Sequence, residues 1–121
     1  MPKNRRVPLP IPDIASEPFV DAEEALFWFV RAQQARDDGA RIQRGLAEII
    51  RPCDPDDIYR AIKELAMRQL IRPRHLEVLQ VYGALMRAPD KRCEEEVQDF
   101  TFWDEALDRL TTILRQKEII E

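Results

Sequence analysis

His75 is the only histidine in the chain, and histidine is the one side chain whose charge ordinarily changes near neutral pH. Nucleophilic catalysis would need a serine or a cysteine beside it, and the sequence near His75 holds neither. The residue stands third in a predicted helix whose apolar face begins at Leu76. We therefore expect His75 at the helix surface or at the rim of a helix–helix contact, without a catalytic role.

Cys53 and Cys93 are the remaining candidates for soft metal ligands or for a nucleophilic thiol. They stand far from each other and from His75, whereas structural zinc sites use closely spaced pairs of cysteines and histidines. Two thiols also fall short of the dense disulfide framework of small secreted proteins. We expect both to be reduced and to act as small buried hydrophobic residues, with no metal and no cofactor.

Carboxylates occur in clusters, at Asp56-Asp57, at Glu94 to Glu96 and at Asp104-Glu105. Two carboxylates act as acid and base where their environments separate their pKa values, and nothing in these polar segments indicates such burial. The three glycines are isolated, so the sequence has no glycine-rich loop for phosphates. We predict a protein that is not an enzyme and that has no small-molecule substrate.

The elements that would position these residues are helices. Apolar residues recur at spacings of three and four, and no alternating run of strand length occurs. Helix starts are marked by Asp21 with Glu24 and by Asp54 with Pro55. The segment 40–50 contains a glycine, so a loop with one or two helical turns is the alternative there. The predicted fold class is all-α, a compact bundle of four to five helices at about residues 22–38, 40–50, 55–69, 73–87 and 100–117.

Residues 1–18 hold five of the nine prolines, which favours an extended arm in front of the helices. Leu9 and Ile11, between these prolines, could bind along the domain itself or along a partner. Residues 19–121 are long enough for one hydrophobic core and are predicted to form a single helical domain. The short turn before Pro73 should make the helices on either side of it spatial neighbours.

The net charge of −4 is spread unevenly, because residues 41–92 have an excess of basic side chains and residues 93–121 an excess of acidic ones. Such a split indicates either an interaction surface or two parts of the fold that face each other. The longest apolar run, residues 25–30, is far below the ~20 residues that cross a bilayer. Prolines also follow the basic start of the chain, where a signal peptide would be apolar. The expected location is the cytoplasm, away from membranes.

The 18 residues from Asp54 to Ile71 have the pattern of a capped amphipathic helix that ends in a Leu-Ile step. This stretch resembles the recognition-helix region of many winged-helix and helix-turn-helix proteins. The resemblance implies a DNA-binding regulator or accessory protein. Six residues would then face phosphates or base edges: Tyr59, Arg60, Lys63, Arg68, Arg72 and Arg74. No β-wing is expected, because Pro73 starts another helix, and the negative net charge opposes the neutralisation of several phosphates.

Four longer segments, residues 24–32, 51–58, 74–83 and 102–110, follow one another over nearly the whole chain. In this order they resemble a family of small uncharacterised all-helical proteins of alphaproteobacteria, of about the same length. The resemblance implies a bacterial protein of the cytosol and transfers no functional residue to this chain.

Phe27, Trp28 and Phe29 widen the apolar stripe of the first helix around most of its first two turns. Such rings are either ordinary core or, where they stay exposed, anchors for a partner. Our first hypothesis is a non-enzymatic protein–protein interaction module that binds another protein or a second copy of itself. The binding surface would be the first helix with Phe27 and Trp28, the arm with Leu9 and Ile11, or the acidic C-terminal helix. The alternative is a protein of the helix-turn-helix type that binds DNA through its basic middle segment.

Overall fold

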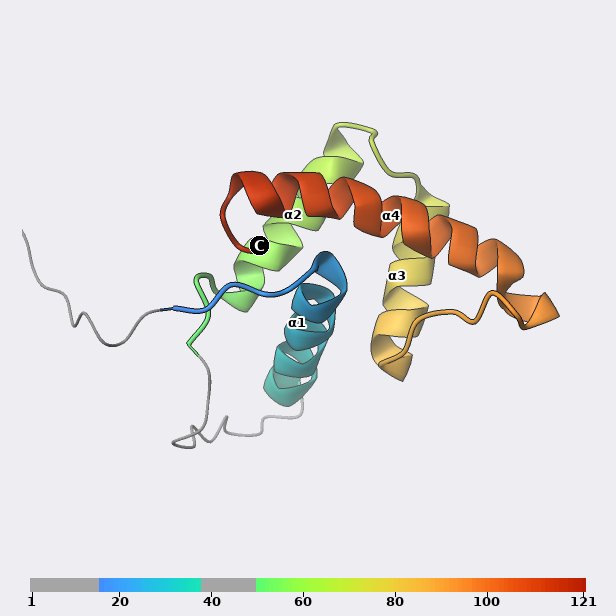
Figure 1. Ribbon diagram of the computed structural model, residues 1–121, viewed down its shortest axis with the longest axis horizontal. Coiled ribbons are helices and arrows are strands. Elements are labelled where there is room, and N and C mark those ends of the chain that lie inside the picture. Colours follow the sequence, from blue (N-terminus) through green and yellow to red (C-terminus); the bar gives the residue numbers. More distant parts are fainter. Residues whose placement is uncertain (1–15, 38–49) are drawn as a thin grey trace, which may run out of the picture.

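The computed structural model describes residues 16–37 and 50–121. The predicted all-α fold is confirmed for this part of the chain, in which four α-helices and a short 3₁₀ helix follow one another without a strand (Figure 1). Most of the predicted arm, with Leu9 and Ile11, and nearly all of the element predicted at 40–50 lie outside the described residues. The elements are α1 (Ala22–Asp37), α2 (Pro55–Met67), α3 (Pro73–Leu85), η2 (Glu94–Glu96) and α4 (Val97–Gln116).

Helix α4 is the longest described helix, and it crosses the other three (Figure 1). Its 20 residues extend over about 30 Å. Helices α2 and α3 are neighbours at the turn that joins them, residues 68–72, but they diverge from this turn instead of lying side by side. The prediction that these two helices are spatial neighbours therefore holds only at the turn, because each turns its apolar face to α4 and α1.

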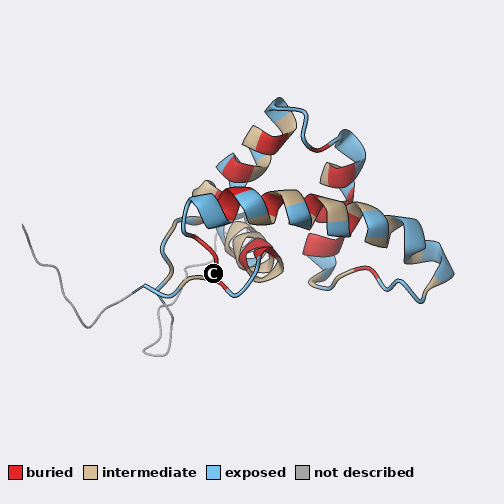
Figure 2. Cartoon of the chain, turned by 45° about the horizontal axis from the view of Figure 1, so that its top comes forward, coloured by how far each residue is buried: buried red, intermediate tan, exposed pale blue. Residues whose placement is uncertain are grey.

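The hydrophobic core has two parts, and Figure 2 shows their buried residues on the sides where the helices face one another. The first part joins α1, α2 and the end of α4, and its largest members include Phe19, Ile58, Leu65, Leu110 and Leu114. The second part joins α1, α3 and the first half of α4, and it consists of Leu26, Val78, Leu79, Tyr82, Trp103 and Ala106. Because α4 contributes to both parts, it ties the domain together.

Side-chain caps start the first two helices, as the sequence predicts. Oδ1 of Asp21 accepts the N–H of Glu24 at 2.9 Å, and Oε1 of Glu24 accepts the N–H of Val20 at 2.7 Å. Oδ2 of Asp57 accepts the N–H of Asp54 at 2.9 Å, and a proline begins α2. Each of these bonds satisfies a backbone donor that a helix start leaves unpaired.

The helix ends differ from the prediction, since α2 and α3 each end two residues earlier than expected. A residue with left-handed backbone conformation follows each of α2, α3 and α4: Gln69 (φ 60°), Met86 (φ 59°) and Glu118 (φ 62°). After α2, the N–H of Leu70 donates to the carbonyl oxygen of Leu65 at 2.9 Å, which is the Schellman arrangement. Glycine usually occupies the left-handed position, so its absence hides these helix ends in the sequence.

The first described residues pair with the last ones. The N–H of Phe19 donates to the carbonyl oxygen of Ile119 at 3.0 Å, and the N–H of Glu121 donates to that of Phe19 at 2.9 Å. Arg51 covers this pairing, because its guanidinium lies 4.3 Å from the centre of the Phe19 ring and donates to the carbonyl oxygen of Glu17 at 3.1 Å. The Arg51 side chain is 13% exposed. These contacts hold the entry to α1 against the end of α4.

Candidate interaction surfaces

His75 lies inside the contact between α3 and α4 and not at the helix surface, since 5% of it is exposed. Its Nδ1 accepts the N–H of Arg72 at 2.9 Å and so caps the start of α3. Its Nε2 lies 2.9 Å from Oε1 of Glu105. Because Nδ1 is an acceptor, the neutral ring carries its proton on Nε2 and donates a hydrogen bond to this carboxylate. Both ring nitrogens are therefore hydrogen-bonded within the protein, where α3 packs against α4.

The two cysteines are half-buried thiols, less enclosed than the sequence predicts. Burial, followed by the nearby carboxylates of Asp57 and Asp54, raises the pKa of Cys53 to about 11. The hydrogen bond that Cys93 donates to Glu95 at 3.1 Å raises the pKa of Cys93 as well. Both thiols therefore stay protonated at neutral pH and are weak nucleophiles. Among the described residues, no group of three His, Cys, Asp or Glu side chains could hold a metal ion.

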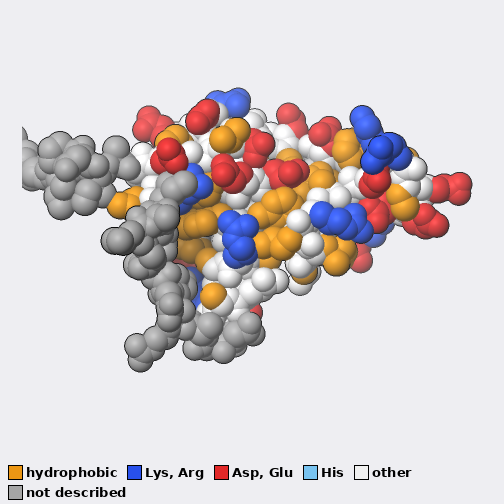
Figure 3. All heavy atoms as spheres, turned by 60° about the horizontal axis from the view of Figure 1, so that its bottom comes forward, with side chains coloured by type: hydrophobic (Ala, Val, Ile, Leu, Met, Phe, Trp, Pro, Cys, Tyr) orange, Lys and Arg blue, Asp and Glu red, His pale blue; other side chains and the backbone are white. Residues whose placement is uncertain are grey.

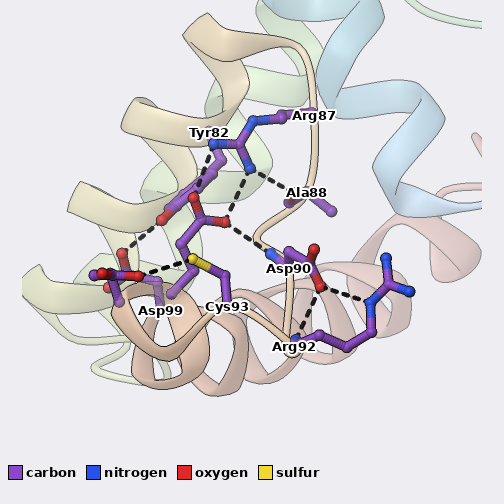
Figure 4. A network of polar contacts seen from close by, with 9 residues as sticks. Tyr82, Arg87, Ala88, Asp90, Arg92, Cys93 and Asp99 are labelled. Carbon is purple, nitrogen blue, oxygen red and sulfur yellow. Dashed lines mark hydrogen bonds and ion pairs between the residues drawn. The ribbon is translucent and has the colours of Figure 1, made fainter.

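A polar network joins the end of α3 to the start of α4 (Figure 4). Arg87 donates two hydrogen bonds, both 2.9 Å long, to the carboxylate of Glu96. This bidentate contact lowers the pKa of Glu96 to about 2. The hydroxyl of Tyr82 donates to Asp99 at 2.7 Å, and burial together with this hydrogen bond raises the pKa of Tyr82 to about 12. At neutral pH these groups hold fixed protonation states, so the network is structural.

The same network explains why α4 begins at Val97, three residues before its predicted start near Phe100. Glu96 also accepts the N–H of Asp90 at 2.8 Å, so one carboxylate holds both the loop after α3 and the 3₁₀ helix before α4. A run of three glutamates indicates a solvated loop when it is considered without Arg87. The contact to Arg87 comes from the loop after α3, and it holds this segment as the 3₁₀ helix before α4.

The aromatic residues of α1 are half-buried, and each of them contacts the core. The ring centres of Phe27 and Trp103 are 5.9 Å apart, and those of Trp28 and Phe19 are 5.1 Å apart. Phe29 packs against both parts of the core. The three rings are thus divided among internal contacts, and each keeps part of its surface in solvent. The binding role expected for Phe27 and Trp28 stays a prediction.

Hydrophobic side chains also form an area between charged ones on the face where α1 and α3 end (Figure 3). Helices α1 and α3 approach each other closely, since Cγ2 of Val30 is 3.1 Å from the position that a Cβ on Gly83 would take. Val30 and Phe27 are half-buried against the second part of the core. We interpret this area as the rim of the core, where packed side chains reach the surface.

Of the six residues expected to bind nucleic acid, some are already paired with carboxylates and others are exposed without an ion pair to any described residue. Three of the arginines pair with carboxylates: Arg60 with Asp57 at 3.0 Å, Arg68 with Glu64 at 3.2 Å, and Arg74 with Glu77 at 2.7 Å. Arg74 also donates to Asp99 at 2.8 Å, which ties it to α4. Lys63 and Arg72 are exposed, and within the described ranges neither forms an ion pair. Of the six residues, Tyr59, Arg60 and Lys63 come together on the exposed side of α2.

Two large hydrophobic residues are strongly exposed on α2, Met67 at 74% and Tyr59 at 54%. With Lys63 midway between them, they lie in one column along the helix. The buried residues of α2 lie on its other side: Ile58, Ala61 and Leu65. The three exposed residues Tyr59, Lys63 and Met67 are termed the α2 outer face. Sequence reasoning missed Met67, although its position away from the apolar stripe could have revealed it.

No described helix is both long and apolar enough to span a membrane. Comparisons with known proteins found no matching family model, no matching curated protein and no matching solved structure. A function can therefore be argued from the surfaces and internal contacts of the chain itself.

Proposed function

We propose that this chain is a non-enzymatic protein–protein interaction module and that the α2 outer face is its binding surface. The observation that carries the proposal is the exposure of Met67 at 74% and of Tyr59 at 54% on a helix whose opposite side is core. Apolar surface left in water costs about 25 cal/mol per Å², which a partner that covers it recovers. Tyrosine and methionine are also enriched in protein interfaces.

The internal contacts of the chemically active groups support a role without catalysis. Both nitrogens of His75 are hydrogen-bonded inside the protein, and the pKa of Cys53, at about 11, keeps its thiol protonated. Tyr82 and Glu96 are held by partners that fix their protonation states at neutral pH. These four groups are among those that acid–base or nucleophilic catalysis uses, and their internal contacts support a role in binding instead.

The α2 outer face suits a protein better than a nucleic acid. Affinity for DNA comes mainly from cations that neutralise phosphates, and Arg60 and Arg68 are already paired with carboxylates three and four residues away. Met67 is uncharged and offers nothing to a phosphate, yet no other large hydrophobic residue that is described is as exposed. A protein partner would use the apolar side chains together with Lys63.

The test compares the wild-type chain with the double variant Tyr59→Glu/Met67→Glu, which places two carboxylates on the α2 outer face. The control Gln80→Glu/Gln116→Glu adds the same charge at exposed positions of α3 and α4. Each tagged chain is incubated with a soluble extract of the cells that produce the protein. Proteins that wild type and control retain, and that the α2 variant does not, are identified, purified and titrated by calorimetry.

We expect such a partner to bind wild type and control equally and the α2 variant at least about 100-fold more weakly, because two anchors are lost. Thermal unfolding by circular dichroism checks that all three chains are folded. A purified partner that binds the α2 variant as tightly as wild type would refute the proposal. Binding of a mixed-sequence DNA duplex that depends on Lys63 and Tyr59 would establish the alternative function instead.

A further inference from the structure

The α2 outer face presents three kinds of chemistry at a regular spacing. A helix rises 1.5 Å per residue, so Tyr59 and Met67 are about 12 Å apart along the axis of α2, with Lys63 midway. Residues four apart lie on the same side of a helix. A partner on this side therefore meets an aromatic ring, a cation and a thioether, in that order.

Lys63 carries the unbalanced charge of this surface. The carboxylates of α2 in its neighbourhood are each held by an arginine: Asp56 by Arg36 at 3.2 Å, Asp57 by Arg60 at 3.0 Å, and Glu64 by Arg68 at 3.2 Å. Lys63 is exposed, and it forms no ion pair with any residue in the described part of the chain. A carboxylate between two apolar contacts would complement this surface.

Building on the proposed function, we infer that the partner segment is an acidic amphipathic helix in which two large apolar residues, seven positions apart, flank a glutamate or aspartate. Seven positions extend over about 10.5 Å, close to the separation of Tyr59 and Met67. In a helix, residues at positions one, four or five, and eight share one face, so the carboxylate lies between the apolar residues. An extended segment would need the same three side chains at alternate positions, about 13 Å from the first to the third, so the spacing that is selected distinguishes the two.

The experiment selects a phage-displayed library of random peptides, each about 16 residues long, on the full chain in three forms. The forms are wild type, Lys63→Glu and Met67→Glu. Wild type should enrich peptides with two large apolar residues seven positions apart and an acidic residue between them. Lys63→Glu should enrich the same apolar spacing with lysine or arginine in the middle, and Met67→Glu should enrich neither class.

The most enriched acidic peptide is then synthesised, and its affinity is measured by fluorescence anisotropy. It should bind wild type about tenfold more tightly than Lys63→Glu, with a smaller difference at high salt, because ions screen an exposed charge pair. Enriched peptides without an acidic residue would overturn the inference. So would enrichment of the same peptides by Lys63→Glu, or their retention by Met67→Glu.

The proposed function has a separate readout, which is the purified cellular partner. Its binding must depend on Tyr59 and Met67 whatever the charge of the partner. If that partner requires both residues but binds Lys63→Glu as tightly as wild type, the proposed function stands and the acidic helix is refuted. If the partner ignores Tyr59 and Met67, the proposed function itself fails.

Discussion

The aromatic stretch of α1 and the outer face of α2 have similar apolar chemistry and opposite packing. In α1, the ring of Phe27 lies 5.9 Å from a tryptophan of α4, and that of Trp28 lies 5.1 Å from a phenylalanine before the helix. On α2, Tyr59 and Met67 are 54% and 74% exposed. The difference arises because other elements reach the rings of α1. Clustered rings in a sequence therefore indicate core as readily as an interface, and tertiary contacts decide between them.

The largest expected effect is on stability, where substitutions in α1 should cost much more than substitutions on the α2 outer face. Phe27→Ala and Trp28→Ala remove rings that pack on the core, and each should lower the free energy of unfolding by about 2–3 kcal/mol. Tyr59→Ala and Met67→Ala remove side chains that mainly contact water, and each should change it by less than about 0.5 kcal/mol. Urea unfolding followed by circular dichroism measures both pairs. A loss above about 1 kcal/mol for Met67→Ala would mean that the outer side of α2 is packed in solution.

The second prediction concerns Arg51, whose contacts hold the aromatic stretch of α1 in place. Arg51 lies over the ring of Phe19, on which Trp28 packs, so Arg51→Ala should lower the free energy of unfolding by about 2 kcal/mol. Arg68→Ala breaks a pair whose side chains are 61% and 43% exposed, and it should cost about 0.5 kcal/mol or less. Urea unfolding of both variants gives the comparison. Equal losses would mean that the α1 region does not depend on this arginine.

The pair of Arg87 and Glu96 extends the comparison to charged groups and to pH. Because Arg87 lowers the pKa of Glu96 from 4.5 to about 2, the folded chain takes up this proton less readily than the unfolded chain. The stability gained is complete above about pH 4.5 and is lost as the pH falls towards 2. The difference between wild type and Glu96→Gln should therefore shrink over this range.

Urea unfolding at a series of pH values measures that difference. The control is Glu64→Gln, which removes one partner of the exposed pair on α2 and should have the smaller effect at neutral pH. A stability difference for Glu96→Gln that is as large at pH 2 as at neutral pH would contradict the role given to Arg87.

The sequence predicts those parts of the fold that depend on local bonds. Asp21 and Asp54 mark helix starts because the donors and acceptors of a cap lie within three residues of each other. The helix ends are less predictable, since Gln69 holds a left-handed conformation that local rules assign to glycine. The start of α4 at Val97 depends on Arg87, which lies in the loop after α3, nine residues before its partner Glu96, and helix-start patterns do not reach that far.

The residues of the candidate site divide in the same way, because local contacts are predictable from the sequence and contacts between elements are not. Arg60 and Arg68 count as DNA-facing cations when charge is summed along the chain, yet their carboxylate partners stand three and four residues away, where helix geometry makes side chains neighbours. This pairing, and the exposure of Met67, could be predicted from helical periodicity. The burial of His75 could not, because Glu105 of α4 accepts its hydrogen bond.

The smallest expected effect is a gain in stability at the end of α2. Gln69 is exposed and has a φ of 60°, a conformation that costs a residue other than glycine about 1 kcal/mol. Gln69→Gly should raise the free energy of unfolding by about 0.5 kcal/mol, because the flexibility of glycine in the unfolded chain offsets part of the relief. Glu118→Gly, in the turn after α4, should raise the free energy of unfolding by a similar amount. Met86→Gly should gain less, since the side chain of Met86 is half-buried and its contacts are lost.

Gln69→Gly also tests whether binding belongs to the helix or to the turn that follows it. Gln69 stands two residues beyond Met67, outside the column formed by Tyr59, Lys63 and Met67. The change relieves the backbone of the turn and leaves the three side chains of the α2 outer face in place. Calorimetric titration with the purified partner should therefore give the wild-type affinity, although the chain itself is more stable. A weaker affinity would assign part of the interface to the turn and would reduce the contrast between α2 and the packed rings of α1.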